Sequence, residues 1–151
     1  MRFGIEDIST EAANCLTDDR RDKKCDALYI DRDTGTAVIA QGWFSAHERD
    51  HAPLNKASDL NTAVAWVIGG QHPSMGESLM AAAGELADSL ARGEIESIEI
   101  WYCHNVPESE AVKVELQKAA ESASGHLALR YPDLDIPVRY LEVGIGRLSD
   151  W

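Results

Sequence analysis

Apolar residues occur along this chain in short runs and in longer stretches with helical spacing. Four short runs rich in β-branched or aromatic residues predict strands at about Ala27–Asp31, Thr36–Gly42, Ile98–Cys103 and Val138–Val143. Gly35 lies in the polar connection between the first two runs, and such a connection favours a hairpin. The pattern therefore predicts a sheet that begins with an antiparallel pair of strands.

The longer stretches predict four helices. The first covers about Ile5 to Leu16, and the second begins at Ser58 or Asp59 and is stopped by Gly69-Gly70. A third is predicted from a capping box of Ser74 and Glu77 up to Gly93, and a fourth, long helix is opened by Pro107. The polar segment 45–55 contains Pro53 and is interpreted as a loop.

The predicted order is helix, strand, strand, helical insert, strand, helix, strand. Strands that are joined through helices are usually parallel, with the helices packed on the faces of the sheet. The sequence therefore predicts an α/β fold with a mixed sheet. At 151 residues, the chain has the size of a single domain with its own core.

The composition of the chain bears on its location in the cell. The start of the chain carries acids where a signal peptide needs an apolar run, and no apolar segment reaches the ~20 residues that span a bilayer. The three cysteines are far apart and form no C-x-x-C pair, which is typical of reduced thiols. We expect a cytoplasmic protein that does not enter the membrane.

The net charge of −12 bears on possible partners. Proteins that bind phosphate backbones usually carry a clustered basic surface. Here the only basic run, Arg20 to Lys24, is interleaved with aspartates. It could contact a backbone or simply form a solvated turn. We therefore expect DNA or RNA to bind the isolated chain weakly, and a protein partner or a second copy of the chain is the alternative.

Asp26 and Gln41 are the candidate metal ligands. Asp26 stands at the start of the first strand and Gln41 near the end of its hairpin partner, so the two oxygens could converge on one ion. Phosphodiester hydrolysis uses a hard cation such as Mg²⁺ or Mn²⁺ held by carboxylate and amide oxygens. An Asp followed by a hairpin is also common in proteins without a metal, and Asp26 could simply close a polar turn.

Three segments carry a family resemblance, in the order in which the family has them. They are Asp22–Asp31 with Val38–Gln41, then His104–Ser109 (H-N-V-P-E-S) continuing to Val114–Leu116, and then Glu142–Gly144 followed by Leu148 and Trp151. In these segments the chain resembles the N-terminal nuclease-like domain of the AIPR family, the abortive phage infection proteins, which has a PD-(D/E)xK restriction-endonuclease-like fold. The resemblance spans about residues 17–151. It implies the first domain of a longer phage-defence protein or a stand-alone relative.

The same resemblance implies an active site in which this chain departs from the pattern. A lysine is expected two residues after Gln41, and Trp43 stands there. Asp26 and Gln41 would hold Mg²⁺, and Glu11, or alternatively Glu6, would be a helical glutamate that joins them. Arg49 or Lys56 could replace the missing positive charge. The expected function is a phage-defence domain with a degenerate metal site and weak or no Mg²⁺-dependent nuclease activity.

Two other interpretations remain open. His47-Glu48-Arg49-Asp50-His51 matches the H-E-x-x-H zincin motif, which on a helix would bind Zn²⁺ with Glu48 as general base. A polar loop is the competing interpretation, since Pro53 follows at once. The other class is a non-catalytic module that senses a partner or dimerises. His104 is interpreted as a hydrogen-bonded structural residue and Asn105 as the cap of the following helix.

Overall fold

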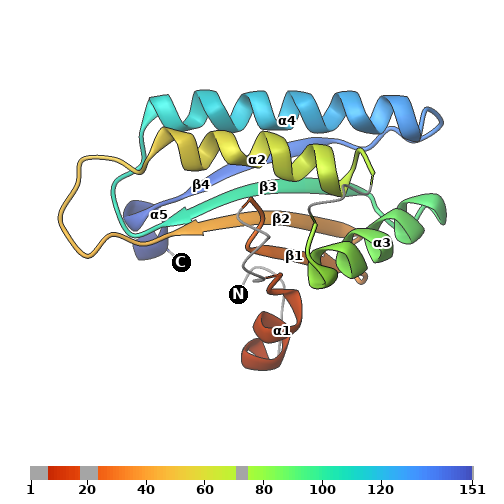
Figure 1. The fold of residues 1–151 in the computed structure, drawn as a ribbon, viewed down its shortest axis with the longest axis horizontal. Helices are drawn as coiled ribbons and strands as arrows, with labels where there is room; N and C mark the ends of the chain where they lie inside the picture. Colours follow the sequence, from red (N-terminus) through yellow and green to blue (C-terminus); the bar gives the residue numbers. More distant parts are fainter. Residues whose placement is uncertain (1–6, 18–23, 71–74, 151) are drawn as a thin grey trace.

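The protein forms a four-stranded mixed sheet with helices packed against it (Figure 1). The computed structural model describes residues 7–17, 24–70 and 75–150. The strands are β1 (Ala27–Asp31), β2 (Thr36–Trp43), β3 (Ser97–His104) and β4 (Val138–Val143), and they lie in the order β1-β2-β3-β4. All four predicted strands are confirmed, with ends that differ by at most one residue.

The pairing follows from the connections. β1 and β2 are antiparallel and are joined by a short turn, in which Gly35 has a φ of 63° and Asp31 accepts hydrogen bonds from Asp33 and Thr34. β2 pairs with β3, and β3 with β4, in parallel, because each of these connections contains helices. The carboxyl ends of three neighbouring strands therefore lie at one end of the molecule.

Two helices cover one face of the sheet. α2 and α4 lie side by side over it, α3 lies near β1, and α1 projects from the other side (Figure 1). A short helix, α5, follows β4 directly and was not predicted. The bounds are Ile8–Cys15 for α1, Leu54–Val67 for α2, Glu77–Ala91 for α3, Glu110–Arg130 for α4 and Ile145–Asp150 for α5.

The core lies between the sheet and the pair α2 and α4. Alternate residues of β2 and β3 point into it, including Ile39 and Ile100, both fully buried. On the helices, the buried residues recur at helical spacing, among them Leu60 on α2 and Leu116 on α4. The predicted apolar stripe of α4 is confirmed, with all six of its members buried: Val112, Leu116, Ala119, Ala120, Ala123 and Leu127.

Three helix starts differ from the predictions. α2 begins at Leu54 after Pro53, so part of the predicted loop is helical, because proline sets a φ suited to a helix entry. α4 begins at Glu110 with Ser109 as its cap, three residues after Pro107. α3 has Gly76 at its N-cap, and Ser74 lies outside the described residues. The stops at Gly70 and Gly93 hold, both at positive φ.

α1 is the element whose packing the sequence described least well. Its predicted apolar face is not buried. No described residue of α1 is buried, and Ile8 is 56% exposed. Asp7 caps it by accepting a hydrogen bond from the N–H of Thr10. After it, Leu16 forms a single antiparallel bridge to Ala27. The helix is thus tied to β1 by its end and not by an apolar stripe.

Candidate functional site

Asp26 and Gln41 are brought to the same end of the β1–β2 hairpin. The N–H of Asp26 donates to the carbonyl oxygen of Ala40 at 2.9 Å, and its Oδ2 accepts a hydrogen bond from the N–H of Gly42 at 2.7 Å. One carboxylate oxygen of Asp26 is therefore engaged by the backbone of the neighbouring strand. Gln41 is 2% exposed and lies on the core side of β2, as Ile39 does.

Their side chains lie toward different faces of the sheet. Burial raises the pKa of the Cys103 thiol to about 11, and the charge of Asp26 adds to this effect. Cys103 pairs with Gly42 and belongs to the face opposite the core. Burial also raises the pKa of Tyr102, the partner of Gln41 in β3, but there the added charges are those of Glu142 and Asp59. Asp26 Oδ2 lies 3.7 Å from where a Cβ on Gly42 would stand, on this same outer face, so the carboxylate and the amide do not converge.

Trp43 and Arg49 occupy the place of the lysine that the resemblance implies. The indole of Trp43 packs against the core on the same side as Gln41. The guanidinium of Arg49 lies over this ring, 5.9 Å from its centre, which is a cation–π distance. A positive charge thus stands beside position 43, although it is held by the ring. Closer to Asp26 in sequence, Lys24 forms an ion pair with Asp59 of α2.

Glu11 lies over the middle of β1. It is exposed on α1 and lines a cavity of about 260 Å³ with Tyr29 and, from α3, Glu85. Burial raises the pKa of Tyr29, as do the negative charges of Asp31 and Glu11. Glu11 therefore lies beside Tyr29 and Glu85, whereas Asp26 is bonded to Gly42 at the end of the hairpin; Glu6, the alternative to Glu11, lies outside the described residues.

These donors do not fit a Mg²⁺ site as they stand. Mg²⁺ is usually held by one or two carboxylates that point at the same spot, together with water and substrate phosphate. Here there is one partly engaged carboxylate, at Asp26, and an amide on the other face, at Gln41. Among residues 7–17, 24–70 and 75–150, no group of three or more His, Cys, Asp or Glu side chains is arranged to hold a metal.

The H-E-x-x-H segment lies in an irregular loop between β2 and α2. Residues 44–53 contain no helix, so His47 and His51 lack the fixed one-turn spacing of a zincin. His51 Nδ1 lies 3.0 Å from the carbonyl oxygen of Ala52, and the side chain of Glu48 is exposed. The polar-loop interpretation describes this segment.

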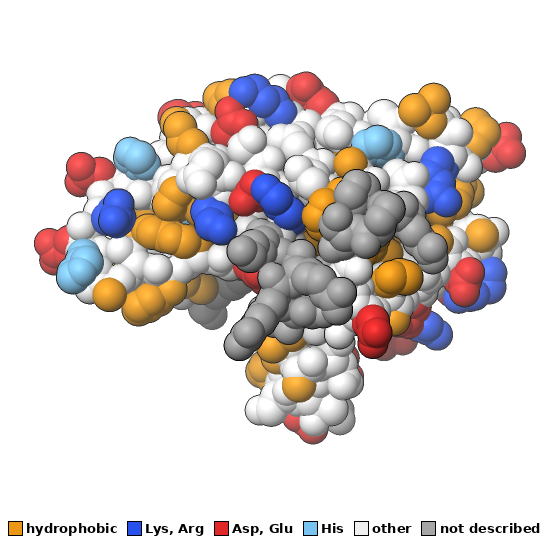
Figure 2. Space-filling view, in the orientation of Figure 1, with side chains coloured by type: hydrophobic (Ala, Val, Ile, Leu, Met, Phe, Trp, Pro, Cys, Tyr) orange, Lys and Arg blue, Asp and Glu red, His pale blue; other side chains and the backbone are white. Residues whose placement is uncertain are grey.

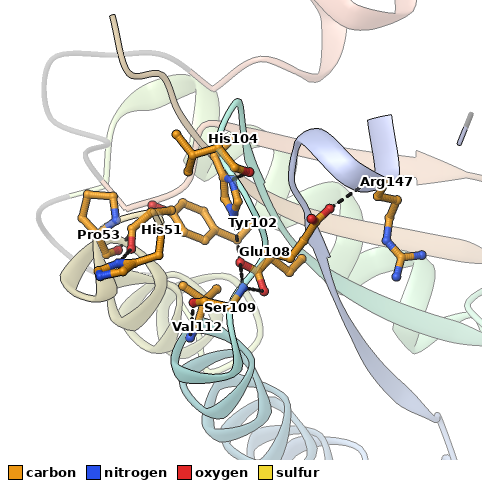
Figure 3. A network of polar contacts seen from close by, with 11 residues as sticks. His51, Pro53, Tyr102, His104, Glu108, Ser109, Val112 and Arg147 are labelled. Carbon is orange, nitrogen blue, oxygen red and sulfur yellow. Dashed lines mark hydrogen bonds and ion pairs between the residues drawn. The ribbon is translucent and has the colours of Figure 1, made fainter. Parts of the chain in front are cut away.

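The best-defined polar cluster lies where β3, β4 and α4 meet (Figure 3). His104 is buried there, with Nδ1 3.0 Å from the carbonyl oxygen of Val106 and Nε2 3.1 Å from Oε1 of Glu142. Glu142 also accepts the N–H of Ser109 at 3.0 Å. The two side chains are 0% and 2% exposed, and the Tyr102 ring meets the imidazole edge-on. The expected hydrogen-bonded, structural role of His104 is supported by these contacts.

The hydrogen-bond partners of His104 indicate which ring nitrogen carries a proton. Both ring nitrogens face oxygen atoms, and a carbonyl oxygen can only accept a hydrogen bond, so Nδ1 carries a proton. Glu142 in turn accepts the backbone N–H of Ser109, so both buried side chains of the pair have hydrogen-bond partners.

Asn105 connects this cluster to the loop after β2. Its Nδ2 donates to the carbonyl oxygen of Ser45, and its Oδ1 accepts the N–H of Ser45, both at 2.8 Å. The prediction that Asn105 caps the following helix is wrong: Ser109 is the cap, with its Oγ accepting the N–H of Val112 at 3.3 Å. The extra residues of the junction move the helix start beyond the reach of Asn105.

Glu108 and α5 complete the junction. The Glu108 carboxylate accepts the N–H of Arg147 at 2.8 Å, at the start of α5 (Figure 3). Burial alone would raise its pKa, but the backbone N–H groups of Arg147, Gly146 and Gly144 outweigh it and lower the pKa. A Cβ on Gly144 would lie 2.7 Å from the carbonyl oxygen of Val106, so only glycine fits this approach.

Some residues of the junction are recognisable from the sequence and others are not. Ser109 before Glu110 is a recognisable cap signal. Glu142 belongs to one of the motifs that resemble the family, but the residues around it do not indicate that it is buried against His104, 38 positions earlier. The Ser45–Asn105 pair likewise depends on the register of β2 against β3, which only the folded sheet defines.

The fold and these contacts define an α/β protein with a mixed sheet and a polar junction at its strand ends. Comparison of the chain with protein-family models, curated proteins and solved structures found no match. Among the described residues, no helix combines the length and apolar character needed to cross a membrane.

Proposed function

We propose that this chain is a restriction-endonuclease-like domain of the AIPR type whose metal site is degenerate, and that it serves a phage-defence protein as a partner-binding module. The motif order Asp22–Gln41, His104–Ser109 and Glu142–Gly144 supports the family. The order of strands and helices and the four-stranded mixed sheet are compatible with it.

One observation carries the functional part. Trp43, in the position of the implied lysine, is packed against the core with Arg49 stacked over it. An indole offers a single N–H donor and cannot balance the charge of a phosphate or orient an attacking water as an ammonium group does. The divergent placement of Asp26 and Gln41 supports the same proposal.

The test is a cleavage assay on plasmid DNA and on a structured RNA, with Mg²⁺ and with Mn²⁺. We expect wild type and Asp26→Ala to be equally inactive. Asp133→Asn is a matched control, since it removes one charge from an exposed loop far from β1. Metal-dependent cleavage by wild type and Asp133→Asn that disappears in Asp26→Ala would overturn the degenerate-site proposal.

A further inference from the structure

A cavity of about 730 Å³ lies at the carboxyl ends of β2, β3 and β4. It is lined by the residues that follow each of these strands: 45–50 after β2, 105–107 after β3, and Ile145 after β4. Ligands of open α/β sheets usually bind outside the carboxyl ends of parallel strands, because the loops diverge there. We call this cavity the strand-end pocket.

The walls of the strand-end pocket are held in place by the junction. The two hydrogen bonds between Ser45 and Asn105 fix the start of the loop to the end of β3. Ser45 Oγ also donates to the carbonyl oxygen of His47 at 2.7 Å, and the N–H of Ile145 donates to that of Val106 at 3.0 Å. The part of the lining formed by Ser45, Asn105, Val106 and Ile145 therefore needs little ordering when a ligand binds.

The lining combines acidic and apolar groups. Glu48 and Asp50 are exposed, and in the described part of the chain neither has an ion-pair partner. Ile145 is 51% exposed beside them, and Phe44, next to Ser45, is 75% exposed. Figure 2 shows this end of the molecule, at the left, with acidic and basic side chains beside hydrophobic ones.

The charge of the strand-end pocket indicates which kind of ligand it would bind. The only cation of the lining is Arg49, which is stacked on Trp43, so the two carboxylates outnumber it. The whole chain has a net charge of −12, which repels a polyanion such as DNA or RNA. A basic group would pair with Glu48 or Asp50, and an apolar neighbour would cover Ile145.

We propose that the strand-end pocket binds a short peptide segment of a partner protein that carries a basic side chain next to an apolar one. This inference rests on the proposed function, because it names the site and the chemistry of the partner that such a module would bind. The binding site is distinct from the Asp26 region, so the two proposals fail in different experiments.

The experiment measures the fluorescence anisotropy of three labelled peptides of equal length, made of Lys and Leu, of Lys and Ser, and of Glu and Leu. At physiological salt, we expect the Lys/Leu peptide to bind wild type most tightly. Neutralising the pocket with Glu48→Gln and Asp50→Asn should weaken its binding by about tenfold. The matched control is Asp133→Asn with Asp135→Asn, the same charge change on the loop before β4, which should leave binding unchanged.

The apolar half of the proposal has its own pair of variants. Ile145→Ser should weaken the Lys/Leu peptide several-fold, whereas Leu129→Ser, at an 82% exposed position on α4, should not. Circular dichroism verifies that each variant is folded.

Four outcomes would overturn the inference: no binding of Lys/Leu by wild type, equal binding of Lys/Ser, equal binding of Glu/Leu, or equal losses in a pocket variant and its control. Equal binding of Lys/Ser, or equal losses in Glu48→Gln/Asp50→Asn and in its Asp133→Asn/Asp135→Asn control, would mean general attraction to an acidic surface. DNA cleavage that depends on Asp26 would instead overturn the proposed function and leave these peptide measurements standing.

Discussion

The two ends of the family-like pattern are built very differently. At the β3–β4 junction, the buried side chains of His104 and Glu142 bond to each other, and Glu142 also accepts the N–H of the half-buried Ser109. At the hairpin end, Asp26 is held by a backbone N–H, while Gln41 is buried on the other face of the sheet. The first region is a closed network, and the second is a set of residues that share a strand end without converging.

This difference separates what the motifs say about fold from what they say about activity. The most distinctive motif, His104 to Ser109, has an internal structural partner for His104, Asn105, Glu108 and Ser109. It therefore supports the architecture and carries no information about catalysis. The positions that would carry the chemistry are those at which the chain departs from the pattern, above all Trp43.

The largest expected effect comes from breaking the buried pair. Removing the imidazole with His104→Ala leaves the buried Glu142 carboxyl group without its hydrogen-bond partner and opens a cavity, which together should cost ~3–5 kcal/mol. Asp26→Ala removes one hydrogen bond to a backbone N–H at a partly exposed site and should cost only ~1 kcal/mol. Urea denaturation of the two variants measures both values. Equal losses of unfolding free energy in His104→Ala and Asp26→Ala would contradict the proposed difference between the two regions.

The next effect tests how tightly the junction is packed. Gly144→Ala would place a methyl group 2.7 Å from a backbone oxygen and 2.8 Å from the His104 ring, and such overpacking costs ~1–3 kcal/mol. Gly84→Ala is the matched control, because its site on α3 has no atom within 4 Å. There the same change should stabilise the helix by ~0.5–1 kcal/mol. Thermal melting should show a lower melting temperature for Gly144→Ala and a higher one for Gly84→Ala. An unchanged melting temperature for Gly144→Ala would mean that the neighbouring atoms can move to make room for the methyl group.

The smallest effect is the pH dependence of Glu108. Because its pKa is lowered in the folded state from the ordinary 4.5, its contribution to stability is present above about pH 4.5 and is lost as pH falls through the folded value. Wild type should therefore melt at a higher temperature than Glu108→Gln near neutral pH, and the two should converge as the pH falls below the folded pKa of Glu108. A gap that stays constant over this range would mean that the charge of Glu108 does not stabilise α5.

Features that depend on neighbouring residues in the sequence could be predicted, and features that depend on residues far apart in the sequence could not. The strands and the stops at Gly70 and Gly93 follow from local composition and were predicted closely. The role of Asn105 was missed because its partner, Ser45, is 60 positions away. Similarly, the alternation that turns Asp26 and Gln41 apart depends on the irregular pairing just before β1. Local sequence patterns determine where helices and strands form, whereas the contacts of a site depend on the register in which the strands pair.

The parallel pairing of β2 with β3 has a consequence for how the protein folds. Thr36 pairs with Ser97, so this ladder joins positions roughly 60 residues apart, whereas the β1–β2 hairpin closes over a short turn. Long-range pairings carry a larger loop-closure entropy and form slowly. We expect the hairpin to form early and the Ser45–Asn105 and His104–Glu142 contacts to appear only in the final, rate-limiting docking of β3 and β4.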